Sequence, residues 1–249
     1  MTAGAPKLSG KRILITGGAG GVGRAVAGCM VAEGARVLIA DREEADPRNI
    51  AERLRDGPGQ AAAVASDLSE PAGIARMFAS ADEWLGGLDM LIACAGVGSG
   101  PLMEMDDAGW RYVIESNLSS YVACTRGAIE RIRAAGIEDG TVILVGSISV
   151  HIKAVGESVY NAAKGGVASF AETLRKELMP EHIRLTLIEP GAIGTAMQPC
   201  SPEERAAQVE EHRMLAPADV AEAILFAATR RPGVDVVTLR IEPQIQKIH

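Results

Sequence analysis

Aromatic residues are scarce in this chain: they make up 3% of its 249 residues, whereas hydrophobic residues of all kinds make up 47%. Aliphatic side chains and close backbone contacts must therefore build the interior. The 28 glycines are spread along the whole sequence, which argues against a flexible low-complexity chain and favours helices packed tightly on a sheet. A chain of this length can bury most of its apolar surface, so we expect a single domain over residues 1–249.

Cysteine is equally sparse, and its spacing excludes a zinc site. The four cysteines are far apart, with no Cys-x-x-Cys motif and no paired spacing of Cys and His. Three of them, Cys29, Cys94 and Cys124, have apolar or small neighbours, and we expect these to be buried as small hydrophobic residues. No metal ion is expected.

A concentrated basic surface is missing as well. The formal net charge is -7 and the isoelectric point is about 5.2, and Lys and Arg form no cluster. We therefore expect neither nucleic acid nor an anionic membrane as a partner. The basic N-terminal residues precede no apolar signal segment, and no apolar run reaches the length of a membrane span. These absences predict a cytoplasmic protein.

Short apolar runs alternate with longer helical patterns along the chain. Seven runs have the aliphatic, β-branched composition and turn signals of buried strands: residues 12–16, 36–40, 61–65, 88–93, 141–145, 184–188 and 236–241. Six stretches between them have helical patterns: residues 22–33, 47–55, 74–84, 107–133, 158–178 and 217–228. This alternation predicts an α/β fold with a Rossmann-type, doubly wound parallel sheet of seven strands and helices on both faces.

The first expected strand runs directly into a glycine-rich turn at residues 16–23 (TGGAGGVG), which a helix follows. Glycines let the backbone approach a pyrophosphate closely, and the helix N-terminus offers free N–H groups and a positive dipole end. An ordinary tight turn between strand and helix is the alternative. A nucleoside triphosphate loop is excluded, because Arg24 and Ala25 follow Gly23 where such a loop needs Lys and then Ser or Thr.

Asp41 ends the second expected strand, about twenty residues after the glycines. A carboxylate there can bind both hydroxyls of an adenosine ribose and would repel the 2′-phosphate of NADP. The expected cofactor is therefore NAD, with NADP less favoured. Arg42 complicates this prediction, because it could stack on adenine or attract a phosphate. The alternative is that Asp41 only caps the following turn.

Tyr160 and Lys164 lie four residues apart in an expected helix, a spacing that places them on one helix face. A nearby ammonium and the charge of an oxidised nicotinamide would favour the phenolate and lower the pKa of the tyrosine. Ser147 follows the fifth expected strand, at the carboxyl edge of the sheet where such folds bind ligands. Its hydroxyl could hold a substrate oxygen, with Ser149 as its rival. For Tyr160 and Lys164 the alternative is an ordinary surface pair.

These motifs resemble the short-chain dehydrogenase/reductase family in its compact form, over nearly the whole chain. The glycine pattern Thr-Gly-x-x-x-Gly-x-Gly, the serine thirteen residues before the tyrosine and the Tyr-x-x-x-Lys motif all match. The resemblance implies a catalytic set of Asn117, Ser147, Tyr160 and Lys164, in which Asn117 anchors a water that relays protons to the lysine. The residues expected to bind the cofactor, including Asp41 and Arg42 discussed above, are Thr16, Gly17, Gly21, Val22, Gly23, Asp41, Arg42, Asp67, Leu68, Ala95, Gly96, Tyr160, Lys164, Pro190, Gly191, Ile193 and Thr195.

Two segments depart from the family pattern. Many members have Asn-Asn-Ala-Gly after the fourth strand, whereas this chain has Ala93-Cys94-Ala95-Gly96. The backbone can still approach a cofactor ribose there, but the support that amide side chains give to the strand is missing. A Val-Asp-Gly-Gly segment is also absent, and residues 239–244 instead look like the branch that contains hydroxy-acid and amino-acid alcohol dehydrogenases.

The resemblance implies an NAD-dependent oxidoreductase that transfers a hydride between NAD and a small secondary alcohol or carbonyl compound. A non-catalytic NAD-binding sensor or scaffold of the same fold is the alternative. Residues 193–214 are expected to form a mobile lid over the substrate, and His151 to recognise a polar substrate group or to pack in its loop. A homo-oligomer, either tetramer or dimer, is expected to form through the helices at 107–133 and 158–178.

Overall fold

The structure, a computed structural model that describes residues 6–246, contains one sheet of seven parallel strands. In spatial order these are β3 (Gln60–Ala65), β2 (Arg36–Asp41), β1 (Arg12–Thr16), β4 (Met90–Ala93), β5 (Thr141–Val145), β6 (Arg184–Pro190) and β7 (Thr238–Ile241). The predicted doubly wound parallel sheet is confirmed. Chain order reverses between β1 and β4, so the segments that follow these two strands leave toward opposite faces, the usual place of a ligand in such sheets.

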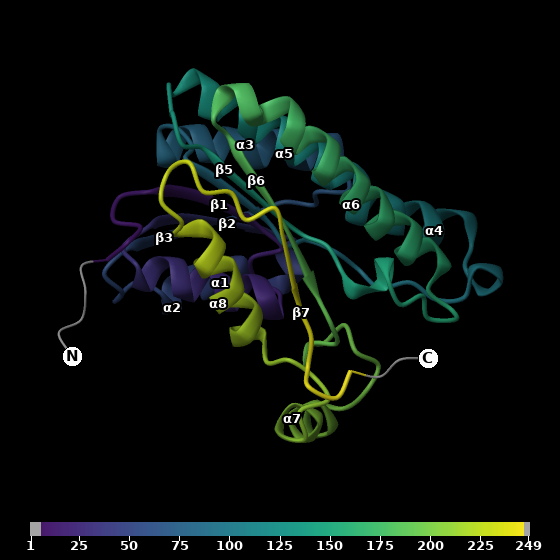
Figure 1. The fold of residues 1–249 in the computed structure, drawn as a ribbon. Helices are drawn as coiled ribbons and strands as arrows, with labels where there is room; N and C mark the ends of the chain where they lie inside the picture. The colour runs from purple at the N-terminus through teal and green to yellow at the C-terminus, as the bar shows by residue number, and fades with distance from the viewer. Residues whose placement is uncertain (1–5, 247–249) are drawn as a thin grey trace.

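Helices cover both faces of the sheet (Figure 1). On one face lie α1 (Gly21–Ala32), α2 (Pro47–Arg53) and α8 (Pro217–Ala228), and on the other α3 (Pro71–Leu85), α5 (Ser120–Ala134) and α6 (Ser158–Leu178). Side chains alternate between these layers along each strand. Leu14 of β1 belongs to the aliphatic core beneath α3, α5 and α6, whereas Ile13 and Ile15 belong to the core beneath α1 and α8. Of the helices within residues 6–246, none combines the length and apolar character that crossing a membrane requires.

The helix predicted over residues 107–133 is interrupted, so that prediction was wrong in part. α4 (Asp107–Ile114) leads into one π-helical turn, Glu115–Ser119, before α5 begins. A π-helical turn contains one extra residue, but the chain stays helical on both sides of it. The spacing of apolar residues therefore predicts one helix and does not reveal the turn. Such turns are frequent at functional sites, and this one contains Asn117.

The segment predicted to be a lid contains a helix of its own, α7 (Pro202–Glu210). A capping box begins this helix: Ser201 Oγ accepts from the N–H of Glu204 at 3.1 Å, and the Glu204 carboxylate accepts from the N–H of Ser201 at 2.8 Å. None of its residues is buried. The helix therefore lacks the apolar stripe by which a helix is usually predicted.

Arg12 and Asp89 join the amino ends of β1 and β4. The Arg12 guanidinium donates to Asp89 from Nε at 2.8 Å and from Nη2 at 3.3 Å, and the Arg12 N–H donates to the same carboxylate at 2.8 Å. Burial by itself raises the pKa of Asp89, but these hydrogen bonds and the arginine charge outweigh it and hold that pKa below its ordinary value. The pair anchors the two strands whose carboxyl ends carry the site.

Asp89→Asn removes the carboxylate charge and keeps the side-chain shape. We expect it to lower the free energy of unfolding by about 2 kcal/mol near neutral pH, because a partly buried guanidinium loses its counter-charge. The folded-state pKa of Asp89 is lowered, so its contribution is present above the pKa of the unfolded chain and is lost as pH falls through the folded-state pKa.

Urea unfolding of both proteins from neutral to strongly acidic pH tests this expectation. The difference between them should shrink at acidic pH, and a constant difference would contradict the ionic role of Asp89. Glu172→Gln is the control, because Glu172 pairs with Lys176 on an exposed helix face and its loss should leave unfolding nearly unchanged.

Candidate active site

The predicted catalytic residues come together at the carboxyl edge of the sheet. Ser147 follows β5, Tyr160 and Lys164 lie in the first two turns of α6, and Asn117 lies in the π-helical turn before α5. The Tyr160 and Ser147 hydroxyls are hydrogen-bonded to each other, and Lys164 Nζ is 6.0 Å from the centre of the Tyr160 ring. Three separate elements therefore supply one cluster.

Ser147, rather than Ser149, is the serine that meets Tyr160. Ser147 Oγ also accepts from the N–H of Ser149 at 3.1 Å, which caps the short 3-10 turn Ile148–Val150. This second bond holds the Ser147 hydroxyl in place. The Ser149 side chain points into the interior instead, where its buried hydroxyl has no hydrogen-bond partner among the described residues.

The protein's own groups raise the pKa of the Tyr160 phenol; the lowered pKa predicted from the sequence includes the charge of an oxidised nicotinamide. Burial raises the Tyr160 pKa above the ordinary value of 10.0, the Ser147 hydrogen bond opposes this rise, and the Glu157 charge adds to it. Lys164 does not reverse the direction, since burial disfavours its own ammonium form. The protein's own groups thus keep Tyr160 protonated near neutral pH.

Lys164 is 3% exposed, and burial lowers its pKa to about 7. Its Nζ donates to the carbonyl oxygen of Val145 at 2.9 Å and to the hydroxyl of Tyr121 at 3.0 Å. Tyr121 was missed in the sequence, where no motif includes it. A polar group one helical turn after Asn117, on the face that turns toward β5, is the one signal that could have indicated it.

Asn117 holds the segment that follows β4. Its Oδ1 accepts from the N–H of Val97 at 3.2 Å, and its Nδ2 donates to the carbonyls of Val97 and Val113, both at 2.9 Å. Thr16 Oγ1 also accepts a weaker hydrogen bond from the N–H of Ala95, at 3.5 Å. Asn117 and Thr16 thus give this segment the support that its own sequence lacks. Both N–H groups of the Asn117 amide and one acceptor site of its Oδ1 are used in this way.

The glycine-rich turn offers the donors that a phosphate group needs. α1 begins at Gly21 after Gly20, with no side-chain cap and no acidic residue in its first turn. Its first N–H groups therefore have no intrahelical acceptor and no capping side chain. Gly17 has φ +64°, and a Cβ on Gly23 would lie 2.1 Å from the Gly17 carbonyl oxygen. The turn is thus restricted to glycine and fits a pyrophosphate at the helix N-terminus.

Asp41 lies beside this turn at the end of β2. Its Oδ2 accepts from the N–H of Ala19 at 2.9 Å, and its Oδ1 accepts from the N–H of Arg42 at 2.8 Å. The carboxylate therefore bonds the backbone of the next residue and holds the glycine-rich turn at the same time, while the short turn Glu43–Ala45 that follows has no side-chain cap. The Arg42 guanidinium is directed elsewhere, with Nη1 donating to the Tyr112 hydroxyl on α4 at 3.0 Å.

Asp67 and Leu68 follow β3, at the same edge of the sheet. Asp67 Oδ1 accepts from the N–H of Ser69 at 2.9 Å and from its hydroxyl at 2.7 Å, and the side chain is exposed. The Leu68 side chain is buried in the core beneath α3. Any contact of Leu68 with a nucleotide would therefore use its backbone.

Residues 190–195 connect β6 to the predicted lid. Ile193 pairs with Leu215 as an isolated parallel bridge, and the N–H of Gly194 donates to the Leu215 carbonyl at 2.9 Å. The two ends of the predicted lid are thereby tied together. Thr195 packs on the start of α1, since a Cβ on Gly21 would lie 2.7 Å from its methyl carbon. The start of the lid thus touches the helix end that would hold a phosphate.

His151 has a buried partner. Its Nε2 lies 3.0 Å from Glu189 Oε2; the histidine side chain is 44% exposed and the glutamate side chain 6%. Glu189 belongs to β6, one residue before Pro190. The contact links the loop after β5 to the end of β6, so His151 does more than fill space in its loop.

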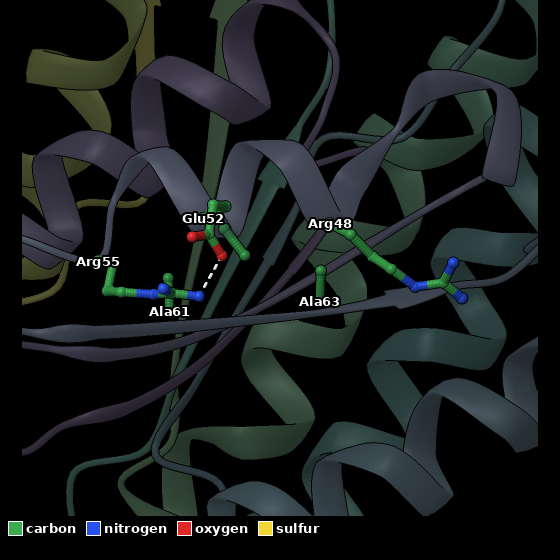
Figure 2. Close-up of a pocket in the computed structure, with 6 residues that line it drawn as sticks. Arg48, Glu52, Arg55, Ala61 and Ala63 are labelled. Carbon is green, nitrogen blue, oxygen red and sulfur yellow. Dashed lines mark hydrogen bonds and ion pairs between the residues drawn. The ribbon is translucent and has the colours of Figure 1, made fainter.

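Two surface cavities lie away from this cluster. The smaller, of about 130 Å³, is lined by residues of α2 and β3, with Arg55 just beyond α2. Figure 2 shows Glu52 and Arg55 ion-paired across it, while the Arg48 side chain points away from them. The larger, of about 680 Å³, lies at the amino edge of β5 and β6. Neither cavity includes a predicted site residue.

Comparison with known proteins gives one consistent match. Residues 11–206 match the family model described as short chain dehydrogenase. Dehydrogenase/reductase SDR family member 11 of Bos taurus is 31% identical over 244 residues, 94% of this chain and 96% of that protein. Cis-4-hydroxycyclohexanecarboxylate dehydrogenase of Sinomonas cyclohexanicum is 34% identical, over 87% of this chain and 88% of its own. The solved structure of the actinorhodin polyketide ketoreductase with NADPH aligns with TM-score 0.84 at 25% identity, covering 95% and 97% of the two chains.

Gly17 and Gly10 form a matched pair for testing the glycine-rich turn. Both have positive φ, +64° and +73°, but a Cβ on Gly17 would lie 2.6 Å from the backbone of Ala95, whereas Gly10 has open space within 4 Å. Gly10→Ala should cost about 1 kcal/mol of unfolding free energy from backbone strain alone. Gly17→Ala should cost about 2 kcal/mol more, because backbone atoms must move apart. Equal losses in urea unfolding would contradict the crowding at Gly17.

Proposed function

The chain belongs to the short-chain dehydrogenase family of oxidoreductases, and we propose that it is an NAD-dependent enzyme that interconverts a small secondary alcohol and its carbonyl compound. The observation that carries this proposal is the hydrogen-bonded pair of Ser147 and Tyr160 beside the buried Lys164. A protein that only binds the nucleotide would have no need of this pair.

The side chains divide the proposed reaction between them. When bound, the nicotinamide supplies hydride transfer at its C4 atom. Ser147 and Tyr160 hold the substrate oxygen, and Tyr160 takes the hydroxyl proton during oxidation or returns it during reduction. Lys164 would donate a hydrogen bond to the nicotinamide ribose and pass the proton of Tyr160 onward. Asn117 contributes by fixing the segment after β4, through its two bonds to Val97.

NAD is proposed over NADP because of Asp41. Its carboxylate is held against the glycine-rich turn by the N–H of Ala19, where it would face a 2′-phosphate as a like charge. Arg42 is bonded to Tyr112 and so is not turned toward that position. The actinorhodin ketoreductase was solved with NADPH, so cofactor preference has to be measured for this chain. A mobile lid over residues 193–214 and an assembly through α5 and α6 stay predictions.

Calorimetric titration with NAD and with NADP is the first experiment. A screen for absorbance of the reduced nicotinamide should follow on the same sample, with secondary alcohols, polyols, hydroxy acids and cis-4-hydroxycyclohexanecarboxylate as probes. NAD binding with turnover of any probe supports the proposal. Binding without turnover over the panel favours the sensor or scaffold alternative, and no binding of either nucleotide contradicts both.

Tyr160→Phe tests the proton-transfer role. The variant keeps the ring and loses the hydroxyl, so we expect kcat to fall by about 10²–10⁴-fold. The dissociation constant of NAD should change little, because the hydroxyl is proposed to serve the substrate oxygen. Retained turnover would exclude Tyr160 as the acid or base, and a large loss of NAD affinity would assign it to binding.

Asp41→Asn tests the cofactor preference. Removing one repulsive charge should shift the ratio of NADP to NAD affinity toward NADP by about tenfold, which corresponds to about 1.4 kcal/mol. Glu43→Gln is the matched control: Glu43 lies two residues further on, where it pairs with Arg48 on the surface. Its loss removes the same charge and should leave the ratio unchanged. An equal shift in both variants would mean that the overall charge matters, and not Asp41.

A further inference from the structure

Tyr121 lies in a part of the site that no sequence motif covers. It belongs to the first turn of α5 and is 1% exposed. Its hydroxyl donates to the Val145 carbonyl at 2.9 Å and accepts from Lys164 Nζ at 3.0 Å. A phenylalanine could fill the same space in the core beneath α5 and α6. The hydroxyl, buried at the centre of a three-way contact, is the feature that a purely packing role does not explain.

We propose that Tyr121 is a positioning residue for Lys164, whose ammonium it holds together with the carbonyl of Val145. This inference rests on the proposed function, in which Lys164 serves the cofactor ribose and Tyr160. An ammonium has three N–H donors. Tyr121 and Val145 accept from two of them, at 3.0 and 2.9 Å, so the direction of the third is fixed.

The third N–H is the donor that remains for the expected cofactor ribose. A Cβ on Gly96 would lie 3.7 Å from Lys164 Nζ and 2.7 Å from Asn117 Oδ1. Gly96 therefore lies so close to the ammonium that a ligand packed on the Gly96 backbone could accept a hydrogen bond from the third N–H. Nζ is nearer to the centre of the Tyr121 ring, at 4.5 Å, than to that of the Tyr160 ring, at 6.0 Å. The ammonium thus lies closer to Tyr121, which accepts its hydrogen bond, than to the ring of the reacting tyrosine.

The hydroxyl of Tyr121 can act only as an acceptor toward Lys164. Burial raises the pKa of Tyr121 well above its ordinary value, so the phenol keeps its proton and donates it to Val145. The other titratable groups around this contact are Cys94 after β4, Cys124 on α5 and Tyr160 on α6. Burial raises the pKa of each thiol to about 12, so both are neutral. Among the described residues no carboxylate is hydrogen-bonded to Lys164, which makes each neutral acceptor important to the ammonium.

Tyr121→Phe removes one acceptor and keeps the ring. The chain has six lysines, so the side-chain signals of ¹³C-labelled lysine can be followed by NMR in the protein without nucleotide, and Lys164→Met identifies the signal of Lys164. Because Tyr121 stabilises the charged form, its loss should lower the titration midpoint of Lys164 by about one pH unit. Calorimetry should show NAD binding about three- to tenfold more weakly, since the third N–H is no longer held in direction.

Thr125→Val is the matched control. Thr125 lies one turn after Tyr121 on α5, is fully buried, and has a hydroxyl with no hydrogen-bond partner within residues 6–246. Its loss should change neither the Lys164 midpoint nor the affinity for NAD. Urea unfolding verifies that each variant is folded, and Tyr121→Met replaces Tyr121→Phe if the latter is not.

The outcomes separate the possible roles of Tyr121. A lower midpoint together with weaker NAD binding supports positioning. An unchanged midpoint overturns the proposal, and a lower midpoint with unchanged NAD affinity overturns it too, because Tyr121 would then tune charge without directing the donor. If the wild-type protein binds neither NAD nor NADP, the proposed function fails, whereas the titration of Lys164 still reports whether Tyr121 holds the ammonium.

Discussion

A contact between two stretches of backbone at the switch point of the sheet governs the rest of the site. β1 and β4 are parallel neighbours, with Thr16 opposite Ala93, and the segments after them leave together before they diverge. Gly17 makes this possible, because a Cβ there would lie 2.6 Å from the backbone of Ala95. One segment then leads to the start of α1, and the other leads to Gly96 beside Lys164 and Asn117. The spacing between the glycine-rich turn and the proposed catalytic groups is therefore set by main-chain packing.

The same packing places the acid–base pair where charge is disfavoured. Burial raises the pKa of Tyr160 and lowers that of Lys164 to about 7. A protonated phenol is ready to give a proton to a developing alkoxide, which is what reduction of a carbonyl compound requires. Oxidation requires the opposite form, and within the proposed function the positive charge of the oxidised nicotinamide favours it. Burial thus sets the protonation of the two groups in the protein alone, and in the proposed function a bound oxidised nicotinamide would favour the phenolate.

Support around the site comes from contacts between separate elements, and some of the groups involved, such as Tyr121, lie outside the family pattern. The segment after β4 lacks its usual amides, and Asn117 and Thr16 bond its backbone instead. Lys164 is held by Tyr121 and Val145. His151 and Glu189 connect the loop after β5 to β6, next to the segment that leads into the predicted lid. These contacts surround the place where a substrate would lie, so differences in specificity between family members can arise here while the catalytic motif stays the same.

The sequence by itself determined the layered fold, because strands buried on both faces must be apolar throughout and helices must alternate with them to connect parallel strands. It also determined the glycine-rich turn and the pairing of Tyr160 with Lys164, since both depend on residues close together in the chain. Only the tertiary structure decided that Tyr121 meets Lys164, 43 residues away, and that His151 meets Glu189, 38 residues away. It also decided that the protein's own groups raise the Tyr160 pKa. These features depend on how deeply each group is buried and on distances between separate elements. A local pattern of residue types gives no information on either.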